Sequence, residues 1–304
     1  WDPDVRALLE KFRFLPRWRI DDIMISFAAT GGSVGAHVDH YDVFLLQAYG
    51  HRRWMIDSSV AMGRKAPDLA FRDDVDIKLL RRFRPTHDWV LAPGDMLYLP
   101  PLVPHHGVAE DPCLTFSVGM RAPSSAELIG DYLDTLIESA DEAVRYHDED
   151  LQAQADPYEI DDAAMRRAIE ALNALRMNDP DRLGDWFGRF ITAYRASGEV
   201  APPPQLPGRD AVEAAFGQGL TLERFPWARL AWRKASRGAT LFCSGLDLPV
   251  GVADARLLAP AETVDGRLYA RLSARGRDAV WALVQAGFYQ PCLLYTSPSP
   301  RDRG

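Results

Sequence analysis

Residues 21–56 read DDIMISFAATGGSVGAHVDHYDVFLLQAYGHRRWMI, and this stretch decides the fold class. Its apolar runs are short and are separated by turns that contain glycine. The same pattern continues through the first 123 residues, where the predicted strands are 24–27, 43–48, 54–56, 89–91, 96–99 and 114–118. Short strands at regular spacing are typical of a β-sandwich or barrel, here preceded by a helix predicted over 4–12.

The hydrophobic period becomes helical after residue 123. Ser124 followed by Glu127 has the form of a capping box, and apolar stripes predict three helices before residue 200. These stripes either pack on one another or form part of a dimer interface. A proline-rich linker over 202–208 leads into an α+β module. The predicted helices of this module lie near 210–216 and 277–286, with short strands at 220–224, 230–233 and 240–243.

The net charge of −8 is distributed unevenly along the chain. Residues 1–123 carry −1, residues 124–200 carry −11 and the remainder carries +4. An acidic chain suits a basic protein partner, and direct nucleic-acid binding is not expected. Three widely separated cysteines indicate a reducing compartment, and no apolar run is long enough to span a membrane. We therefore expect a cytoplasmic protein.

Histidines are concentrated in one part of the chain, with six of the seven between residues 37 and 106. Two consecutive His-x-Asp patterns occupy 37–39 and 40–42. Residues two apart on a strand project from one face, so either pattern offers an imidazole and a carboxylate to one metal ion. His105 or His106, from a proline-flanked bend, would complete a face of two histidines and one carboxylate with open positions. Spacing alone leaves these choices open.

The stretch 21–56, together with PGDMLYLPPLVPHHGVAEDPCLTFSVGMRAP over 93–123, resembles the JmjC-type ribosomal oxygenases. Within that family the similarity is greatest to the bacterial enzymes that hydroxylate an arginine of a large-subunit ribosomal protein. The resemblance implies an α+β chain: a double-stranded β-helix (cupin) barrel over 1–123, a helical dimerisation region over 124–200 and a winged-helix-like module over 201–290.

The resemblance also implies a ligand set. It aligns the iron-binding residues with His37, Asp39 and His105, and it leaves the 40–42 pattern and His106 outside the site. The expected cofactors are Fe(II) and the co-substrate 2-oxoglutarate, with O2 as the oxidant. These three residues are therefore the expected catalytic centre.

Arg52 is the expected partner of the distal carboxylate of 2-oxoglutarate. Strand alternation places Arg52 with Trp54 and Ile56 on an apolar face, where a charge is unusual, and an arginine fork suits a carboxylate. Ser26 and Thr115 are candidates for further hydrogen bonds to the co-substrate. Thr115 stands where the family usually has asparagine, which puts its direct contact in doubt.

Three further residues complete the sequence interpretation of this site. Ser117 is the alternative to Thr115 for a hydrogen bond to the co-substrate. Tyr49, at the turn before Arg52, is expected to line the substrate entrance. Arg53 is expected at the surface.

The expected function is a dioxygenase that hydroxylates the β-carbon of an arginine in a basic ribosomal protein, as a homodimer through the helical region. One alternative is a related oxygenase with another target, either a histidyl hydroxylase or a lysine demethylase. Another is a non-catalytic cupin regulator that binds DNA through the winged-helix module. A zinc or manganese isomerase would leave Arg52 without a role.

Both ends of the chain depart from the family pattern. The chain begins at Trp1 and lacks a further N-terminal portion of the barrel domain, so we expect a truncated front. Residues 291–304, PCLLYTSPSPRDRG, lose the apolar period and are expected to be a non-native tail.

Overall fold

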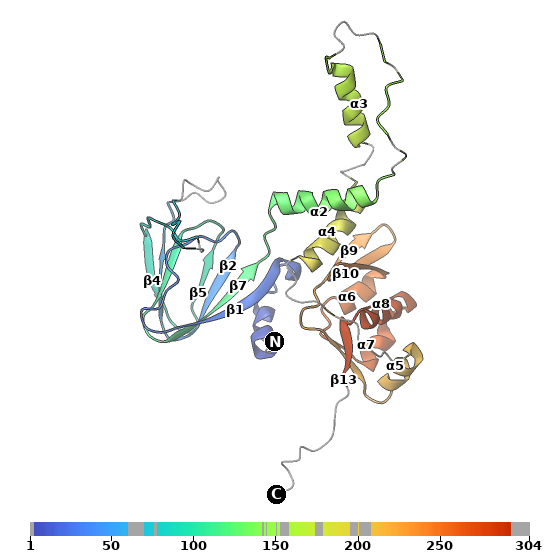
Figure 1. The fold of residues 1–304 in the computed structure, drawn as a ribbon. Coiled ribbons are helices and arrows are strands. Elements are labelled where there is room, and N and C mark those ends of the chain that lie inside the picture. Colours follow the sequence, from blue (N-terminus) through green and yellow to red (C-terminus); the bar gives the residue numbers. More distant parts are fainter. Residues whose placement is uncertain are drawn as a thin grey trace. The chain divides into compact units, whose positions relative to one another are not determined.

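A computed structural model describes residues 3–59, 70–75, 78–141, 143, 145–149, 151–152, 158–173, 179–194, 200 and 208–292. The chain divides into two compact units, Trp1–Ser124 and Ser125–Gly304, which are described separately below (Figure 1). None of the helices within the described ranges is long and apolar enough to cross a membrane.

The first unit contains two antiparallel sheets. One has the strand order β1-β7-β2-β5, with bounds Ile20–Ala28, Cys113–Met120, Val43–Tyr49 and Met96–Leu99. The other has the order β4-β3-β6, with bounds His87–Leu91, Arg52–Ile56 and His105–Ala109. In Figure 1 the two sheets form the blue-to-green barrel.

Side-chain alternation divides the first unit into an inner and an outer apolar cluster. Val43 and Leu45 on β2 pack against Trp54 and Ile56 on β3, which places the inner cluster between the two sheets. Phe44, which points to the other face of β2, packs instead with buried residues on the outside of the first sheet: Phe12, Ile20, Val118 and Met120. Period-two alternation therefore separates the two clusters.

The strand predictions for this unit are confirmed; β5 has the predicted bounds, and the other strands extend beyond the apolar runs. β6 was not predicted, because its sequence HHGVA contains two histidines and a glycine in place of an apolar run. The helix predicted over 4–12 is only partly correct: α1 spans Pro3–Ala7, and Leu8–Phe12 forms a 3₁₀ helix, η1. A second 3₁₀ turn, η2, spans Arg17–Arg19 just before β1.

The second unit begins with the three predicted helices, α2 (Ser125–Glu138), α3 (Asp162–Asn173) and α4 (Pro180–Ala193). Asp179 caps α4 by accepting hydrogen bonds from the backbone N–H groups of Asp181 and Arg182. α2 packs against α4, where the Trp186 indole donates to Asp131 at 2.6 Å and lies against the Tyr132 ring.

The module that follows contains helices and two small antiparallel sheets. Its helices are α5 (Arg209–Phe216), α6 (Val252–Leu258), α7 (Gly266–Arg271) and α8 (Ala274–Gln285). One sheet has the order β11-β10-β9, with bounds Leu246–Val250, Gly238–Cys243 and Leu230–Ala235. The other has the order β12-β8-β13, with bounds Thr263–Val264, Thr221–Arg224 and Tyr289–Cys292.

The core of this module is a continuous cluster of apolar side chains from its helices and both sheets. Leu222, Leu241, Leu258 and Leu283 are completely buried within it. The strand β13 includes Pro291 and Cys292, the first two residues of the expected tail, in register with Leu222 and Thr221 on β8. The rest of that tail, 293–304, lies outside the described residues.

Candidate metal and co-substrate site

Two histidines that are 68 residues apart in sequence lie side by side because their backbones pair. His37 and His105 exchange N–H···O=C hydrogen bonds in both directions, each at 3.0 Å. This reciprocal exchange is that of a hydrogen-bonded antiparallel pair, in which the two residues lie directly opposite each other, and the two imidazole rings have a centroid separation of 4.3 Å. The pairing aligns the start of β6 with the segment before β2, so both rings occupy the same end of the barrel.

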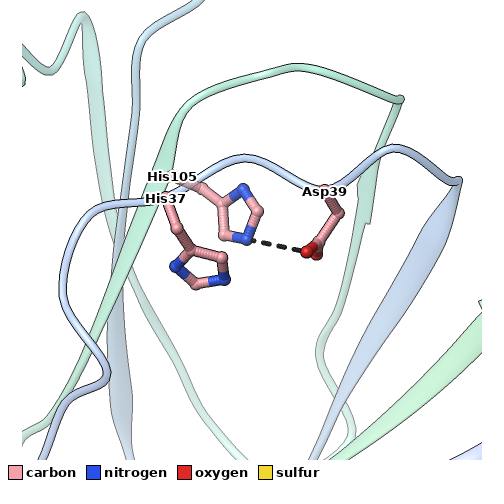
Figure 2. Close-up of side chains that lie close together, drawn as sticks. All are labelled: His37, Asp39 and His105. Carbon is pink, nitrogen blue, oxygen red and sulfur yellow. Dashed lines mark ion pairs between the residues drawn. The ribbon is translucent and has the colours of Figure 1, made fainter. Parts of the chain in front are cut away.

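Asp39 completes a group of three (Figure 2). Its backbone carbonyl accepts a hydrogen bond from the Leu102 N–H at 2.7 Å, which ties it to the bend that precedes His105. Its carboxylate lies 3.6 Å from Nε2 of His105, and the candidate ligand atoms of His37, Asp39 and His105 all lie within 4.8 Å of one another. Among the described residues, this is the group of three or more histidine, cysteine or acidic side chains that could hold a metal ion.

The expectation that His37 and Asp39 share one face of a strand was wrong in its structural detail. His37 forms an isolated bridge and Asp39 lies in an irregular segment before β2. The two side chains converge because backbone hydrogen bonds on both sides fix this segment against His105 and Leu102.

Backbone carbonyls orient both imidazoles in the same way. Nδ1 of His37 lies 2.9 Å from the carbonyl of Gly35, and Nδ1 of His105 lies 2.9 Å from the carbonyl of Val103. A carbonyl only accepts, so each Nδ1 carries the proton and each Nε2 keeps a lone pair for a metal ion. Burial lowers the pKa of His105, which further favours the neutral, ligating imidazole.

The alternative metal ligands that the sequence patterns left open lie elsewhere. Asp42 accepts hydrogen bonds from the Tyr98 hydroxyl at 2.6 Å and from Arg19 at 3.3 Å. Nε2 of His106 is 2.8 Å from the hydroxyl of Ser33, while His40 is exposed. These three side chains lie outside the group formed by His37, Asp39 and His105.

Arg52 lies inside the same barrel with unusually few partners. It is 7% exposed, and burial lowers its pKa. Within the described residues its guanidinium contacts the Thr115 hydroxyl at 3.4 Å and the Trp54 ring at 5.0 Å, and no carboxylate pairs with it. Nε of Arg52 has no hydrogen-bond partner in the part of the chain that the structure describes. A buried cation without a counter-ion is costly, so this arrangement suits an anionic ligand.

A glycine on the neighbouring strand makes room for Arg52. Gly107 of β6 lies opposite Trp54 of β3. A Cβ atom at Gly107 would approach the Trp54 ring to 2.7 Å and Nε of Arg52 to 2.8 Å. The side chains of Arg52 and Trp54 therefore occupy the space that any other residue at position 107 would need.

The remaining predicted residues have different surroundings. Ser26 and Thr115 are opposite each other on β1 and β7, and the Ser26 hydroxyl donates to the Thr115 carbonyl at 3.4 Å. The Thr115 hydroxyl contacts Arg52, and Ser117 is buried farther along the same strand. Tyr49 is 60% exposed at the end of β2.

The sequence interpretation missed Gln47, whose side chain is completely buried. Its Oε1 accepts a hydrogen bond from the Thr115 hydroxyl at 3.0 Å, so it belongs to the surroundings of Arg52. A signal was present in the sequence: Gln47 is the polar residue at an inward-facing position of the apolar run VFLLQAY.

Comparisons with known proteins follow the two-unit organisation. A family model described as the JmjC domain matches residues 7–128, and one described as a ROXA-like winged helix matches residues 174–290. The X-ray structure of E. coli ycfD aligns with a TM-score of 0.81 and 31% identity, covering 96% of this chain and 76% of that one. A structure of YcfD, a ribosomal oxygenase from Escherichia coli, in complex with cobalt and 2-oxoglutarate aligns with a TM-score of 0.78 and 30% identity, covering 96% and 75% of the two chains. The chain belongs to the JmjC-domain ribosomal oxygenases.

Family membership identifies the parts of the fold. The two-sheet barrel is a JmjC cupin fold, and the C-terminal module matches a winged-helix family, in agreement with the fold class expected from the sequence. A sequence relative is the ribosomal protein uL16 3-hydroxylase of Escherichia coli strain K12, 36% identical over 230 residues. That alignment covers 76% of this chain and 60% of the relative, so the chain spans less than two thirds of the relative's length.

Proposed function

We propose that this chain is an Fe(II)- and 2-oxoglutarate-dependent oxygenase that hydroxylates a protein side chain. The observation that carries the proposal is the combination, within one barrel, of three convergent metal ligands and a buried arginine without a carboxylate partner among the described residues. A metal-binding triad by itself fits many chemistries. The additional buried cation requires an anionic ligand, which a 2-oxo dicarboxylate supplies.

His37, Asp39 and His105 would hold the metal through two imidazole Nε2 atoms and one carboxylate oxygen. Three protein ligands leave positions open for a co-substrate and dioxygen. With both bound, the iron centre supplies the oxidising power to insert one oxygen atom into a C–H bond while the 2-oxo acid loses CO2. The Asp39 side chain is 24% exposed and that of His105 is 4% exposed, so solvent reaches the group at Asp39.

Arg52 would bind the distal carboxylate of 2-oxoglutarate. The guanidinium offers its unpartnered Nε and the remaining N–H groups in a planar fork, which matches a carboxylate. The Trp54 ring packs against the fork, and the absence of a side chain at Gly107 leaves the space that the fork occupies. Ser26 and Thr115 would contribute to the polar wall of the same pocket, with Thr115 acting on Arg52 through its hydroxyl.

The proposed substrate is an arginine of a large-subunit ribosomal protein, hydroxylated at its β-carbon. The relative named ribosomal protein uL16 3-hydroxylase supports a ribosomal target and oxidation at position 3. Tyr49, exposed at the end of β2, would line the entrance for this side chain. A ribosomal target would place the enzyme in the cytoplasm, and the net charge of −8 favours a basic protein partner.

We also propose that residues 124–200 form a homodimer interface. In the sequence this helical region follows the catalytic part, 1–123, and precedes the module over 201–290. α2 and α4 enclose an apolar groove of about 550 Å³ lined by Ile129, Tyr132, Leu183 and Phe187 among others. In the described part of the chain, none of the residues of α3 is buried, and its apolar face carries three half-exposed side chains: Met165, Ile169 and Leu172. An apolar groove and a helix with a half-exposed apolar face in one chain fit association with a second copy.

Anaerobic titration with Fe(II) and 2-oxoglutarate tests the site directly. Chelation of the metal by the 2-oxo acid gives a charge-transfer absorption band. We expect the band in the unaltered chain and its loss in His37→Ala, because two protein ligands bind the metal far more weakly than three. His40→Ala is the matched control, since this neighbouring histidine is outside the group and its variant should keep the band.

The absence of a band in the unaltered chain, or an equal band in His37→Ala, would contradict the proposed site. Mass spectrometry then tests the target. A uL16 peptide incubated with the enzyme should gain the mass of one oxygen on an arginine, and a gain on another residue type would reassign the substrate.

A further inference from the structure

We infer that Gln47 is a positioning residue for co-substrate binding, acting on Arg52 through the hydroxyl of Thr115. The inference rests on the proposed function, because it assigns Arg52 to the 2-oxo acid. Gln47 lies on β2 of the first sheet and Arg52 on β3 of the second, so the three side chains form a polar connection between the two sheets of the barrel.

The orientation of the Gln47 amide is determined by its surroundings. Nε2 donates to the carbonyls of Tyr49 at 2.9 Å and Gly50 at 3.1 Å, which uses both of its protons. A flipped amide would bring its oxygen against two carbonyl oxygens. Oε1 is therefore directed away from the turn, where it accepts the hydrogen bond from Thr115 at 3.0 Å.

The orientation of the Thr115 hydroxyl is in turn fixed by Gln47. It has one proton, which it donates to Oε1 of Gln47. Its lone pairs are then free to accept from Nη1 of Arg52, at 3.4 Å. A guanidinium can only donate, so Thr115 can bond to Arg52 only as an acceptor. This requires the hydroxyl proton of Thr115 to point away from Arg52, and Oε1 of Gln47 accepts that proton.

Burial shields this relay from water. Gln47 is 0% exposed, Thr115 1% and Arg52 7%, so water does not compete for these hydrogen bonds. The backbone of Gln47 is also held, since its N–H donates to Asp95 and its carbonyl accepts from Gly94. The relay holds one side of the Arg52 guanidinium and leaves Nε without a partner. Gln47 would thus affect affinity for 2-oxoglutarate without touching it.

Titration of 2-oxoglutarate into the Mn(II)-loaded protein tests the inference. In Gln47→Met and in Thr115→Val the Kd for 2-oxoglutarate should rise about tenfold, the size expected for loss of a hydrogen bond to a charged group. The Kd for Mn(II), measured without 2-oxoglutarate, should stay unchanged. Thr115→Ser keeps the hydroxyl and should retain the unaltered affinity. Thr192→Val, a buried threonine of the second unit, is the matched control and should bind as the unaltered chain does.

Combining Gln47→Met with Thr115→Val separates a relay from a purely structural role. If Gln47 acts through Thr115, the double variant should bind 2-oxoglutarate no more weakly than Thr115→Val alone. Additive losses would overturn the inference, as would unchanged affinity in Gln47→Met.

Thr115→Val covers the case in which Gln47→Met does not fold, because it replaces the hydroxyl of the relay by a methyl group of the same shape. Affinity should fall about tenfold in this variant alone, since Arg52 loses its hydrogen-bond acceptor. Unaltered affinity in Thr115→Val would overturn the inference. Failure of the unaltered chain to bind 2-oxoglutarate would instead refute the proposed function.

Discussion

His37 and His105 acquire their ligand geometry from backbone atoms. Each ring donates through Nδ1 to the carbonyl two residues before it, and each backbone pairs with the other through two hydrogen bonds. The imidazole orientation is therefore fixed before any metal arrives, which lowers the entropic cost of binding one. Arg52 shows the same principle, since the Trp54 ring and the Thr115 hydroxyl restrict its side chain within the space that Gly107 leaves open.

Gly107→Ala tests this restriction at the scale of one methyl group. The added Cβ would meet the Trp54 ring at 2.7 Å and Nε of Arg52 at 2.8 Å, so both side chains must move. We expect the free energy of unfolding to fall by about 1–3 kcal/mol, as for other overpacked cores. Affinity for 2-oxoglutarate should fall as well. Urea denaturation and ligand titration measure the two effects.

Gly130→Ala is the control for Gly107→Ala. Gly130 lies in α2 with open space around its Cβ position, and alanine there should leave binding unchanged and stabilise the helix by about 0.5–1 kcal/mol. Unaltered stability and affinity in Gly107→Ala would show that Arg52 and Trp54 are not confined as described.

At the scale of elements, α4 contacts both α2 and the first sheet of the C-terminal module. Trp186 faces α2, where it bonds to Asp131. Gly188 allows Phe242 of β10 to approach closely, and Arg233 of β9 donates to the side chains of Asp181 and Asp185 at 3.0 Å each. One helix therefore connects the helical region with the module inside the second unit.

Gly188→Ala should disrupt that connection. A Cβ at this position would clash with the Phe242 ring, and both residues are buried. We expect a loss of about 1–3 kcal/mol in the unfolding free energy of the second unit. The triad lies in the first unit, so the Mn(II) affinity should remain as it is. Calorimetry combined with metal titration checks both statements, and a drop in Mn(II) affinity would contradict them.

At the scale of the whole molecule, the apolar groove between α2 and α4 is the main argument for a second copy of the chain. Light scattering after size exclusion should give the mass of two chains. Ile129→Asp, which places a charge at the 59% exposed Ile129 of the groove, should give the mass of one.

Leu246→Asp changes an exposed leucine of β11 outside the groove and should leave the dimer intact. A monomer in the unaltered chain, or a dimer that survives Ile129→Asp, would refute the proposed interface. The hydroxylation and metal titrations do not depend on this outcome, because the triad is contributed by the first unit alone.

Much of the fold could be predicted from local pattern, because strand and helix formation depend on hydrophobic period and turn residues that the sequence displays. The runs 43–48 and 96–99 became β2 and β5, and the helical stripes became α2, α3 and α4. β6 was missed since its strand character comes from pairing with β3 and with the segment at His37, which no local pattern reports.

For the candidate site, the sequence by itself determined which residue types were available: two His-x-Asp patterns, two adjacent histidines after a proline bend, and an arginine on an apolar strand face. The tertiary structure decided which of them converge. The backbone pairing of His37 with His105 brings those two rings together and leaves His106 beside Ser33. The contacts among Gln47, Thr115 and Arg52 likewise depend on how two sheets meet. Convergence of side chains from distant strands is set by register and closure of the barrel, which are long-range properties that residue spacing does not encode.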